Sequence, residues 1–251
     1  MYLAIKGKKI MDKTIYLYED NIGKVEYVQH MGTDLTIVNS ARVSFGKQKD
    51  AINEKDEKLI KYLIKHQHTS TMEHNLVTFR FCVPLFIRSQ HHRHRTWSYN
   101  EISRRYTEEN LRFYEPTKFR SQHKSNRQAS NENDLINPMI NTQVFNEIES
   151  TTTVPAYINA DSAIHKHHLT SLNLFNELIN NGVCREQARG VLPQNLYTEY
   201  YGTCNLNNLI KFIKLRTHDG AQQEIRAVAE ACKTIATELW PITMQNLSLG
   251  N

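Results

Sequence analysis

The segment 76–83 constrains the fold more than any other part of the chain. Its side chains alternate between apolar residues and residues of mixed polarity, and Pro84 follows directly. Because successive side chains of a strand point to opposite faces, this alternation predicts a strand with one buried apolar face. Proline lacks the N–H that a central strand donates, so the strand is expected to end there. The apolar face comprises Val77, Phe79, Phe81 and Val83, and the other comprises Thr78, Arg80 and Cys82.

The remaining patterns predict a mixed α+β fold in which helices outnumber strands. Residues 14–18, 25–29 and 196–203 have strand character, and a hairpin turn is expected at 21–23. Asn205 is expected to cap the helix that follows it. Apolar residues at helical spacing predict helices at 34–44, 57–65, from 85 onward through the His/Arg-rich run, and at 161–180, 185–191, 206–215 and 221–239.

Residues 118–160 have the weakest pattern in the chain. The stretch 125–134 is almost entirely polar, and no apolar periodicity runs through it. This is typical of a long loop or insertion. We expect one domain over residues 1–251 that carries this polar insertion, and no linker between independent domains.

Composition limits where the protein works and what it binds. The net charge of +5 suits anionic small molecules and is too small to require a nucleic-acid partner. No stretch approaches the ~20 apolar residues of a membrane span, and no targeting segment is visible. The cysteines are far apart and form no CxxC pair, which is typical of reduced thiols. The four cysteines are Cys82, Cys184, Cys204 and Cys232. From these observations together, we expect a soluble cytoplasmic protein.

The segment 90–106 contains the highest concentration of charged, histidine and aromatic side chains in the chain. Its seventeen residues include four arginines, three histidines, a glutamate, two tyrosines and a tryptophan. Three interpretations compete: a solvated basic loop, a nucleic-acid patch in which the aromatic rings stack on bases, and an enzyme site whose arginines grip a phosphate. Metal binding is weaker, because no second ligand cluster accompanies these histidines, and the histidines of 165–168 are expected to be a solvated helix start.

The spacing within this segment resembles the signature of flavin-dependent thymidylate synthases. Arg93-His94-Arg95 is followed by seven residues and then Ser103, and Gln90 precedes the motif at the family spacing. Four further blocks resemble the family as well. They are 38–46, the His-x-Ser/Thr-x-x-Glu-His block at 68–74, 185–193, and Leu215-Arg216 with 221–226, so the resemblance runs from about residue 15 to residue 240.

This resemblance implies a thymidylate-synthase-complementing fold, a single α+β domain with a mostly antiparallel sheet flanked by helices. It also implies a homotetramer with FAD between subunits, with NADPH as reductant and 5,10-methylenetetrahydrofolate as carbon donor. No metal is expected, on the spacing of the histidines given above. The implied FAD contacts are Ser44, His68, Ser70, Glu73, Arg93, His94, Arg95, Glu101, Asn205, Asn207 and Lys211. Ser44 and Glu73 could instead be helix caps.

The resemblance also implies a substrate and a mechanism. Arg216 would stabilise the ionised pyrimidine ring of dUMP electrostatically, so that C5 can accept the methylene group. No cysteine has the sequence context of the other thymidylate synthase class, which attacks C6 covalently. A binding role is favoured for Ser103. The implied dUMP contacts are Gln90, Arg93, Glu101, Ser103, Arg104, Arg105, Arg189 and Arg216.

Two positions depart from the family pattern. Asn207 offers an amide where the family usually has an arginine, and Lys211 stands where an asparagine is common. Both are expected at the adenine or ribose edge of FAD, so they affect contacts and not the reaction. The nucleic-acid alternative predicts salt-dependent oligonucleotide binding that survives Arg216→Ala. A degenerate family member that binds flavin and nucleotide without catalysis is a third alternative.

Overall fold

A computed structural model describes residues 13–107, 110–127, 129–141 and 157–247. The chain forms two compact units. The first contains residues 1–83, 87–101 and 198–251, and the second contains residues 84–86 and 102–197. The expectation that the whole chain is one domain stays a prediction.

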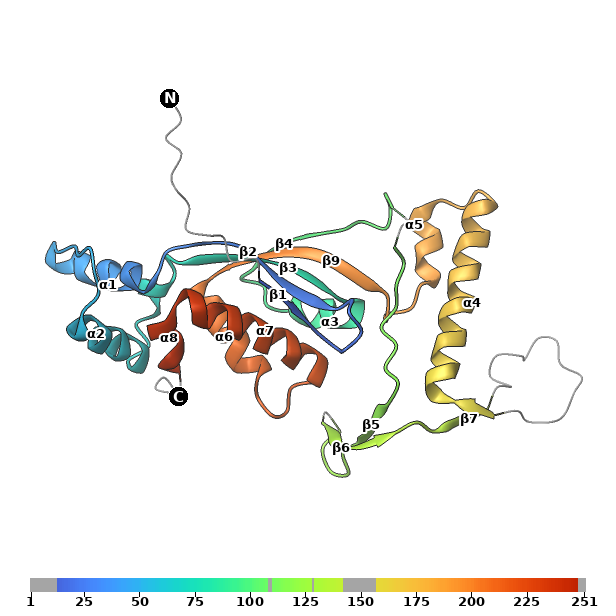
Figure 1. The fold of residues 1–251 in the computed structure, drawn as a ribbon. Helices are drawn as coiled ribbons and strands as arrows, with labels where there is room; N and C mark the ends of the chain where they lie inside the picture. The colour runs from blue at the N-terminus through green and yellow to red at the C-terminus, as the bar shows by residue number, and fades with distance from the viewer. Residues whose placement is uncertain (1–12, 108–109, 128, 142–156, 248–251) are drawn as a thin grey trace, which may run out of the picture. The chain divides into compact units, whose positions relative to one another are not determined.

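The first unit is built on a five-stranded sheet in the order β1-β2-β3-β9-β4 (Figure 1). β2 pairs antiparallel with β1 and β3, and β4 pairs antiparallel with β9. The predicted mixed fold with a mostly antiparallel sheet is therefore confirmed. The strands are β1 (Thr14–Tyr16), β2 (Lys24–Met31), β3 (Leu76–Pro84), β4 (Ser98–Glu101) and β9 (Tyr197–Asn205).

Helices α6 (Leu206–Arg216) and α7 (Gln223–Leu239) lie along one face of this sheet (Figure 1). The four apolar residues predicted for the buried face of β3 are all buried. Phe81 stacks on Tyr200 of β9 with 5.0 Å between ring centroids. Each such side chain contributes about 1.5–3 kcal/mol by leaving water. This apolar layer fixes the segment after β3 and the end of α6, which together form the site described below.

A second helical group contains α1 (Asp34–Arg42), α2 (Glu54–Lys65) and α8 (Pro241–Gln245). The Asn53 side chain accepts from the N–H groups of residues 55 and 56, so α2 begins three residues before its predicted start. The buried carboxylate of Asp34 accepts from Ile242 N at 2.9 Å and from Thr243 N at 3.1 Å. It therefore caps α8, a helix too short for the sequence pattern to predict.

The second unit is built around α4 (Ala160–Asn180) and α5 (Arg185–Ala188), followed by the 3-10 helix η4 (Arg189–Val191). Its core is formed by Phe175, Ala188, Leu192 and Leu196. Helix α4 confirms the helix predicted at 161–180, and α5 with η4 together span the helix predicted at 185–191. The expectation of solvated histidines near the start of α4 is wrong for His168, which is 2% exposed. Its ring stacks on Phe113, and its Nδ1 lies 2.7 Å from a carboxylate oxygen of Glu115.

The described part of the polar insertion is not the predicted loop. It contains β5 (Phe119–Gln122), β6 (Ser130–Ile136), β7 (Met139–Asn141) and β8 (Tyr157–Asn159), which form two separate two-stranded sheets. Polar cross-strand contacts join β5 and β6: Ser121 Oγ donates to Asp134 at 2.6 Å, and Arg120 Nε donates to Ser130 at 2.9 Å. Such strands leave no apolar alternation in the sequence. Residues 142–156 lie outside the described residues.

Candidate functional site

The basic segment is not helical beyond His91. Helix α3 (Leu85–His91) ends there, and a turn then leads into β4. The predicted helix through the Arg93-His94-Arg95 motif is therefore wrong. The Tyr99 hydroxyl lies 3.0 Å from the carbonyl oxygen of His91 and 3.1 Å from that of His94, and donates to both. A hydroxyl shared between two carbonyl groups holds the motif in the turn conformation, because it satisfies groups that a helix would pair internally.

The turn rests on the fully buried side chain of His91. Its Nδ1 lies 2.8 Å from the Tyr200 hydroxyl, and its ring centroid is 4.7 Å from those of both Trp97 and Phe212. Burial lowers the pKa of His91 well below its ordinary value, and the neighbouring Arg216 lowers it further. His91 is therefore a neutral core histidine that anchors the turn.

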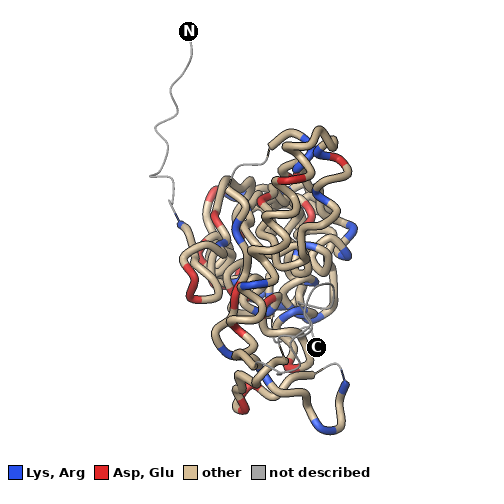
Figure 2. Tube along the Cα trace, turned by 90° about the vertical axis from the view of Figure 1, so that its right-hand side faces the viewer, with Lys and Arg blue, Asp and Glu red and all other residues tan. Residues whose placement is uncertain are grey.

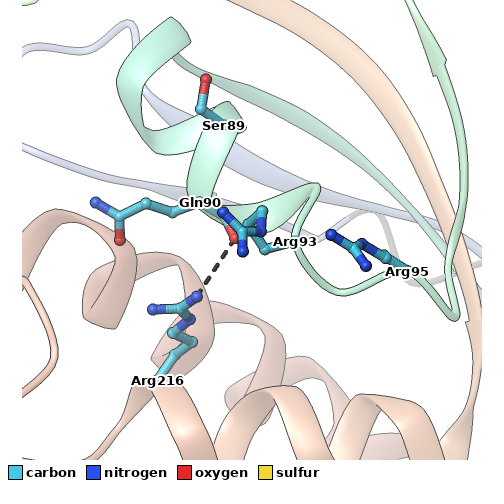
Figure 3. A pocket seen from close by; sticks show the side chains of 5 residues that line it. All are labelled: Ser89, Gln90, Arg93, Arg95 and Arg216. Carbon is cyan, nitrogen blue, oxygen red and sulfur yellow. Dashed lines mark hydrogen bonds between the residues drawn. The ribbon is translucent and has the colours of Figure 1, made fainter.

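Arg216, in the last turn of α6, reaches this turn from the other side. Its Nε donates to Nε2 of His94 at 3.2 Å. One of its terminal nitrogens donates to the carbonyl oxygen of Gln90 at 3.4 Å, which Figure 3 marks with a dashed line. Burial lowers the pKa of Arg216, and the charge of Arg93 lowers it further. The helix end favours this cation, because the last carbonyl groups of α6 carry partial negative charge.

These residues line a pocket of about 670 Å³, which we call the arginine pocket. Its lining residues are Ser89, Gln90, Arg93, Arg95 and Arg216 (Figure 3). No carboxylate of a described residue lies within ion-pairing distance of its three arginines. Guanidinium groups without carboxylate partners favour an anionic ligand, most of all a phosphate that accepts two parallel hydrogen bonds.

Gln90 and Glu101, two further predicted site residues of the first unit, are held by side-chain hydrogen bonds. The side-chain amide of Gln90 donates to Gln222, whose own amide donates to Glu224 at 2.8 Å. Glu101 accepts from Arg88 Nε at 3.1 Å and from the Thr198 hydroxyl at 2.6 Å. Glu101 is thus neutralised by Arg88 and does not pair with the arginines of the pocket.

A second pocket, of about 190 Å³, joins two of the predicted FAD blocks. Lys211 and Lys214 lie at this pocket, and an apolar group that includes Leu63, Met72 and Ile210 lines it; we call it the lysine pocket. Asn207, which is buried, also lines it and donates to Glu73 at 2.9 Å. Apolar walls with a few basic groups are typical of a site for a ring system that carries phosphate.

The other predicted residues of the first unit lie around these pockets or outside them. Asn205 caps α6 as predicted and accepts from the N–H of Asn208 at 2.9 Å. Ser44 is exposed in the 3-10 helix η1 (Val43–Phe45). His68 and Ser70 are exposed at the 3-10 helix η2 (Thr69–Met72), whose Thr69 and Met72 line the lysine pocket.

Four of the predicted dUMP contacts belong to the second unit. Ser103 and Arg105 are joined locally, with Arg105 N donating to the Ser103 hydroxyl at 3.3 Å. Arg104 donates to the carbonyl oxygen of Tyr197 at 3.4 Å. Arg189 is exposed, and its Nε donates to the carbonyl oxygen of Glu186 at 3.3 Å. Their participation in the arginine pocket stays a prediction.

The structure adds residues that sequence reasoning missed. Ser89 lines the arginine pocket, Lys214 lines the lysine pocket, Gln222 binds Gln90, and Tyr99 holds the turn. Gln222 lies in the block 221–226 that resembles the family, so the sequence marked this position but did not indicate its contact with Gln90. Nothing in the sequence indicates the two acceptors of Tyr99, because hydroxyl partners depend on the path of the turn.

Charge and ligand geometry limit what else these residues can do. Basic and acidic residues are interspersed along the chain (Figure 2). In the described ranges, no three His, Cys, Asp or Glu side chains are grouped so as to hold a metal ion. No helix of the described chain is long and apolar enough to cross a bilayer.

Comparisons with known proteins show which family the chain resembles over most of its length. The family described as "Thymidylate synthase complementing protein" matches residues 26–242. The flavin-dependent thymidylate synthase of Thermus thermophilus is 41% identical over 88% of this chain and 73% of its own length. That of Thermotoga neapolitana is 38% identical over 89% of each chain. The crystal structure of the UMP/dUMP methylase PolB from Streptomyces cacaoi, bound with 5-Br dUMP, has a TM-score of 0.74 at 30% identity and covers 89% of this chain and 94% of its own.

Proposed function

This chain belongs to the family of flavin-dependent thymidylate synthases, and on that premise we propose that its arginine pocket binds dUMP for reductive methylation to dTMP. One observation carries the proposal: Arg93, Arg95 and Arg216 line a single pocket without a carboxylate partner among the described residues. A nucleotide supplies what the pocket lacks, a dianionic phosphate together with a ring that can be ionised. PolB, which was solved with 5-Br dUMP, supports the same class of substrate.

We further propose that Arg216 activates the pyrimidine. Its side chain is held by two neutral acceptors, His94 Nε2 and the Gln90 carbonyl oxygen, so its positive charge is not cancelled. A fixed cation beside N3 and O2 of uracil stabilises the ionised ring and raises the electron density at C5. Partial desolvation of Arg216 strengthens this effect, because charges interact more strongly outside bulk water.

The cysteines support activation without a covalent enzyme adduct. Cys82, Cys204 and Cys232 are buried, and burial raises the pKa of Cys204 well above its ordinary value. A thiol must be ionised and accessible to attack C6. The exposed Cys184 belongs to the second unit and is no part of the arginine pocket.

The lysine pocket supports FAD as the flavin of this protein. Its apolar wall suits the face of an adenine ring, and Lys211 and Lys214 suit the pyrophosphate. The buried Asn207 side chain donates to Glu73 at 2.9 Å. When bound, the flavin would supply the hydride for the methylene group of methylenetetrahydrofolate, with NADPH as the reductant. We propose that Lys211, which lines the same pocket as Asn207, supplies the positive charge that the amide of Asn207 lacks.

We also propose a homotetramer that works in the cytoplasm. Val43 and Phe45 are 71% and 77% exposed, an apolar exposure that suits a subunit interface. The described thiols are free, as they are in a reducing compartment. Ser103, Arg104, Arg105 and Arg189 would complete the dUMP site. Light scattering of the purified protein tests the assembly, and a monomer at working concentration would contradict it.

The visible spectrum of the purified protein tests the function. We expect a flavin absorbance that NADPH bleaches and that recovers without oxygen when dUMP and methylenetetrahydrofolate are added together, with dTMP as product. Recovery with folate alone, or the absence of dTMP, would contradict the proposal. Oligonucleotide binding that survives Arg216→Ala would instead favour the nucleic-acid interpretation of the basic segment.

A further inference from the structure

We propose that His94 is a positioning residue for Arg216: its neutral ring, with the proton on Nδ1, accepts from Arg216 Nε and so aims the guanidinium into the arginine pocket. This inference rests on the proposed function of Arg216. It gives His94 a task different from the flavin contact that the family resemblance implies.

The direction of the hydrogen bond determines the tautomer. An arginine nitrogen can only donate, so Nε2 of His94, 3.2 Å from Arg216 Nε, must be the acceptor. A neutral imidazole that accepts at Nε2 carries its proton on Nδ1. His94 therefore cannot serve as a base at Nε2 while Arg216 is in place.

The surroundings keep the ring in this position. The Phe212 ring, one helical turn before Arg216 on α6, meets the His94 ring edge-on at 4.9 Å between centroids. The backbone of His94 is fixed separately, because its carbonyl oxygen accepts from the Tyr99 hydroxyl at 3.1 Å. Helix α6 thus supplies both the arginine and the aromatic wall that orients its acceptor.

The charges nearby keep His94 neutral. Burial lowers its pKa to about 4, and the positive charge of Arg216 contributes to the shift. None of the carboxylates in the described chain is paired with His94. The ring therefore remains an acceptor at neutral pH, where a protonated ring would repel Arg216.

The consequence is a guanidinium with one edge occupied and the other available. Nε and one terminal nitrogen are engaged by His94 and the Gln90 carbonyl oxygen. The rest of the group remains for a ligand at the arginine pocket, which Arg216 lines (Figure 3). An orientation fixed before the substrate arrives costs no reorganisation during the reaction.

Two substitutions separate the role of Nε2 from the mere presence of a polar ring. His94→Gln places an amide oxygen near the position of Nε2, whereas His94→Asn reaches only the position of Nδ1. We expect His94→Asn to lower kcat/KM for dUMP by about tenfold to a hundredfold, as the loss of a hydrogen bond to a charged group does. His94→Gln should restore most of the activity. Flavin content and Tm, measured on each variant, should match the wild type.

A double-mutant cycle with Arg216→Lys tests whether the two residues act as one unit. Lysine has no Nε–H of this kind, so His94→Asn should cost less than about twofold in the Arg216→Lys background. The proposal is overturned if His94→Asn lowers kcat/KM equally in the wild-type and Arg216→Lys backgrounds. It is also overturned if His94→Gln is as inactive as His94→Asn, or if either variant loses its flavin.

A spectroscopic measurement keeps this test separate from the proposed function. In ¹⁵N-histidine-labelled enzyme, the signals that disappear in His94→Gln should show the Nδ1–H form at pH 7, and Arg216→Lys should shift them. The Nε2–H form would overturn the inference even in an active enzyme. A wild-type enzyme that makes no dTMP, but shows the Nδ1–H form, would instead overturn the proposed function and leave the pairing supported.

Discussion

Arg80 and Arg216 belong to the same unit and have opposite electrostatic surroundings. Arg80 on β3 lies between Glu199 and Glu26; burial lowers its pKa, but the two carboxylates outweigh burial and raise it. Among the described residues, the Arg216 side chain of α6 donates hydrogen bonds to a neutral ring and a carbonyl oxygen, and burial together with the charge of Arg93 lowers its pKa. The fold neutralises the first charge and leaves the second for a ligand. The same residue type is therefore paired with carboxylates on the sheet and, in the proposed site, lines a pocket without a carboxylate partner among the described residues.

The strongest test of this comparison removes each arginine in turn. Arg216→Ala should lower the turnover of dUMP by about 1000-fold, the scale of a lost electrostatic group in a transition state. Its fold should persist, because Arg216 lies at the end of α6. Single-turnover formation of dTMP measures the effect. Arg80→Ala is the matched control and should retain turnover; an equal loss in both variants would break the distinction between the two arginines.

Asp56 extends the comparison to a fully buried carboxylate. Burial raises its pKa, but hydrogen bonds from Lys49, Asn53 and Arg42 outweigh burial and lower the pKa to about 2. Asp56→Asn should therefore lower the free energy of unfolding at pH 7 by about 1–3 kcal/mol. The stabilisation by this depressed pKa is present above the unfolded value and is lost as pH falls toward 2. Urea unfolding of the wild type and of Asp56→Asn at pH 7 and at pH 3 measures the loss of stability at neutral pH and its decrease with acid. An unchanged stability of Asp56→Asn at pH 7 would contradict a structural role of this carboxylate.

Tyr99→Phe tests whether the turn itself matters to the arginine pocket. The variant removes the donor shared by the carbonyl oxygens of His91 and His94 and preserves the ring. We expect stability to fall by about 1 kcal/mol and KM for dUMP to rise by about tenfold, because a misplaced turn shifts Arg93 and Arg95. Titration of dUMP monitored by the flavin spectrum checks the binding. Unchanged affinity would mean that the turn holds its shape without the hydroxyl.

The smallest effect is expected at Glu115 in the second unit. Burial raises its pKa, but the hydrogen bonds from His168 and His165 outweigh burial and lower it. A depressed carboxyl pKa stabilises the folded state above its unfolded value, about 4.3, and this contribution is lost as pH falls below that value. Glu115→Gln should flatten the acid limb of the pH–stability curve without changing the pocket arginines. Thermal unfolding from pH 6 to pH 3 checks this, and a curve that matches the wild type would contradict it.

The sequence predicts an element correctly where the local pattern alone determines the structure of the segment. The alternation of 76–83 fixed β3 and its buried face, and Asn205 preceded a helix that it caps. Local patterns predicted the wrong structure where the hydrogen-bond partners of a segment lie elsewhere in the chain. The helix expected through Arg93-His94-Arg95 is a turn, because the Tyr99 hydroxyl satisfies two of its carbonyl groups. The pairing of β5 with β6 was not predicted, because the polar contacts between these strands leave no periodic apolar signal.

The sequence by itself determined the fold class, the family and the residues that bear charge, since these depend on spacing and residue type along the chain. Only the tertiary structure decided which of those charges remain available. The Arg93-His94-Arg95 motif and Arg216 are more than a hundred residues apart, and the pairing of Arg216 with a neutral histidine depends on how α6 packs beside the turn. Tertiary packing determines whether a carboxylate lies next to an arginine. Arg80 and Arg216 therefore differ in their electrostatic surroundings although they are the same residue type.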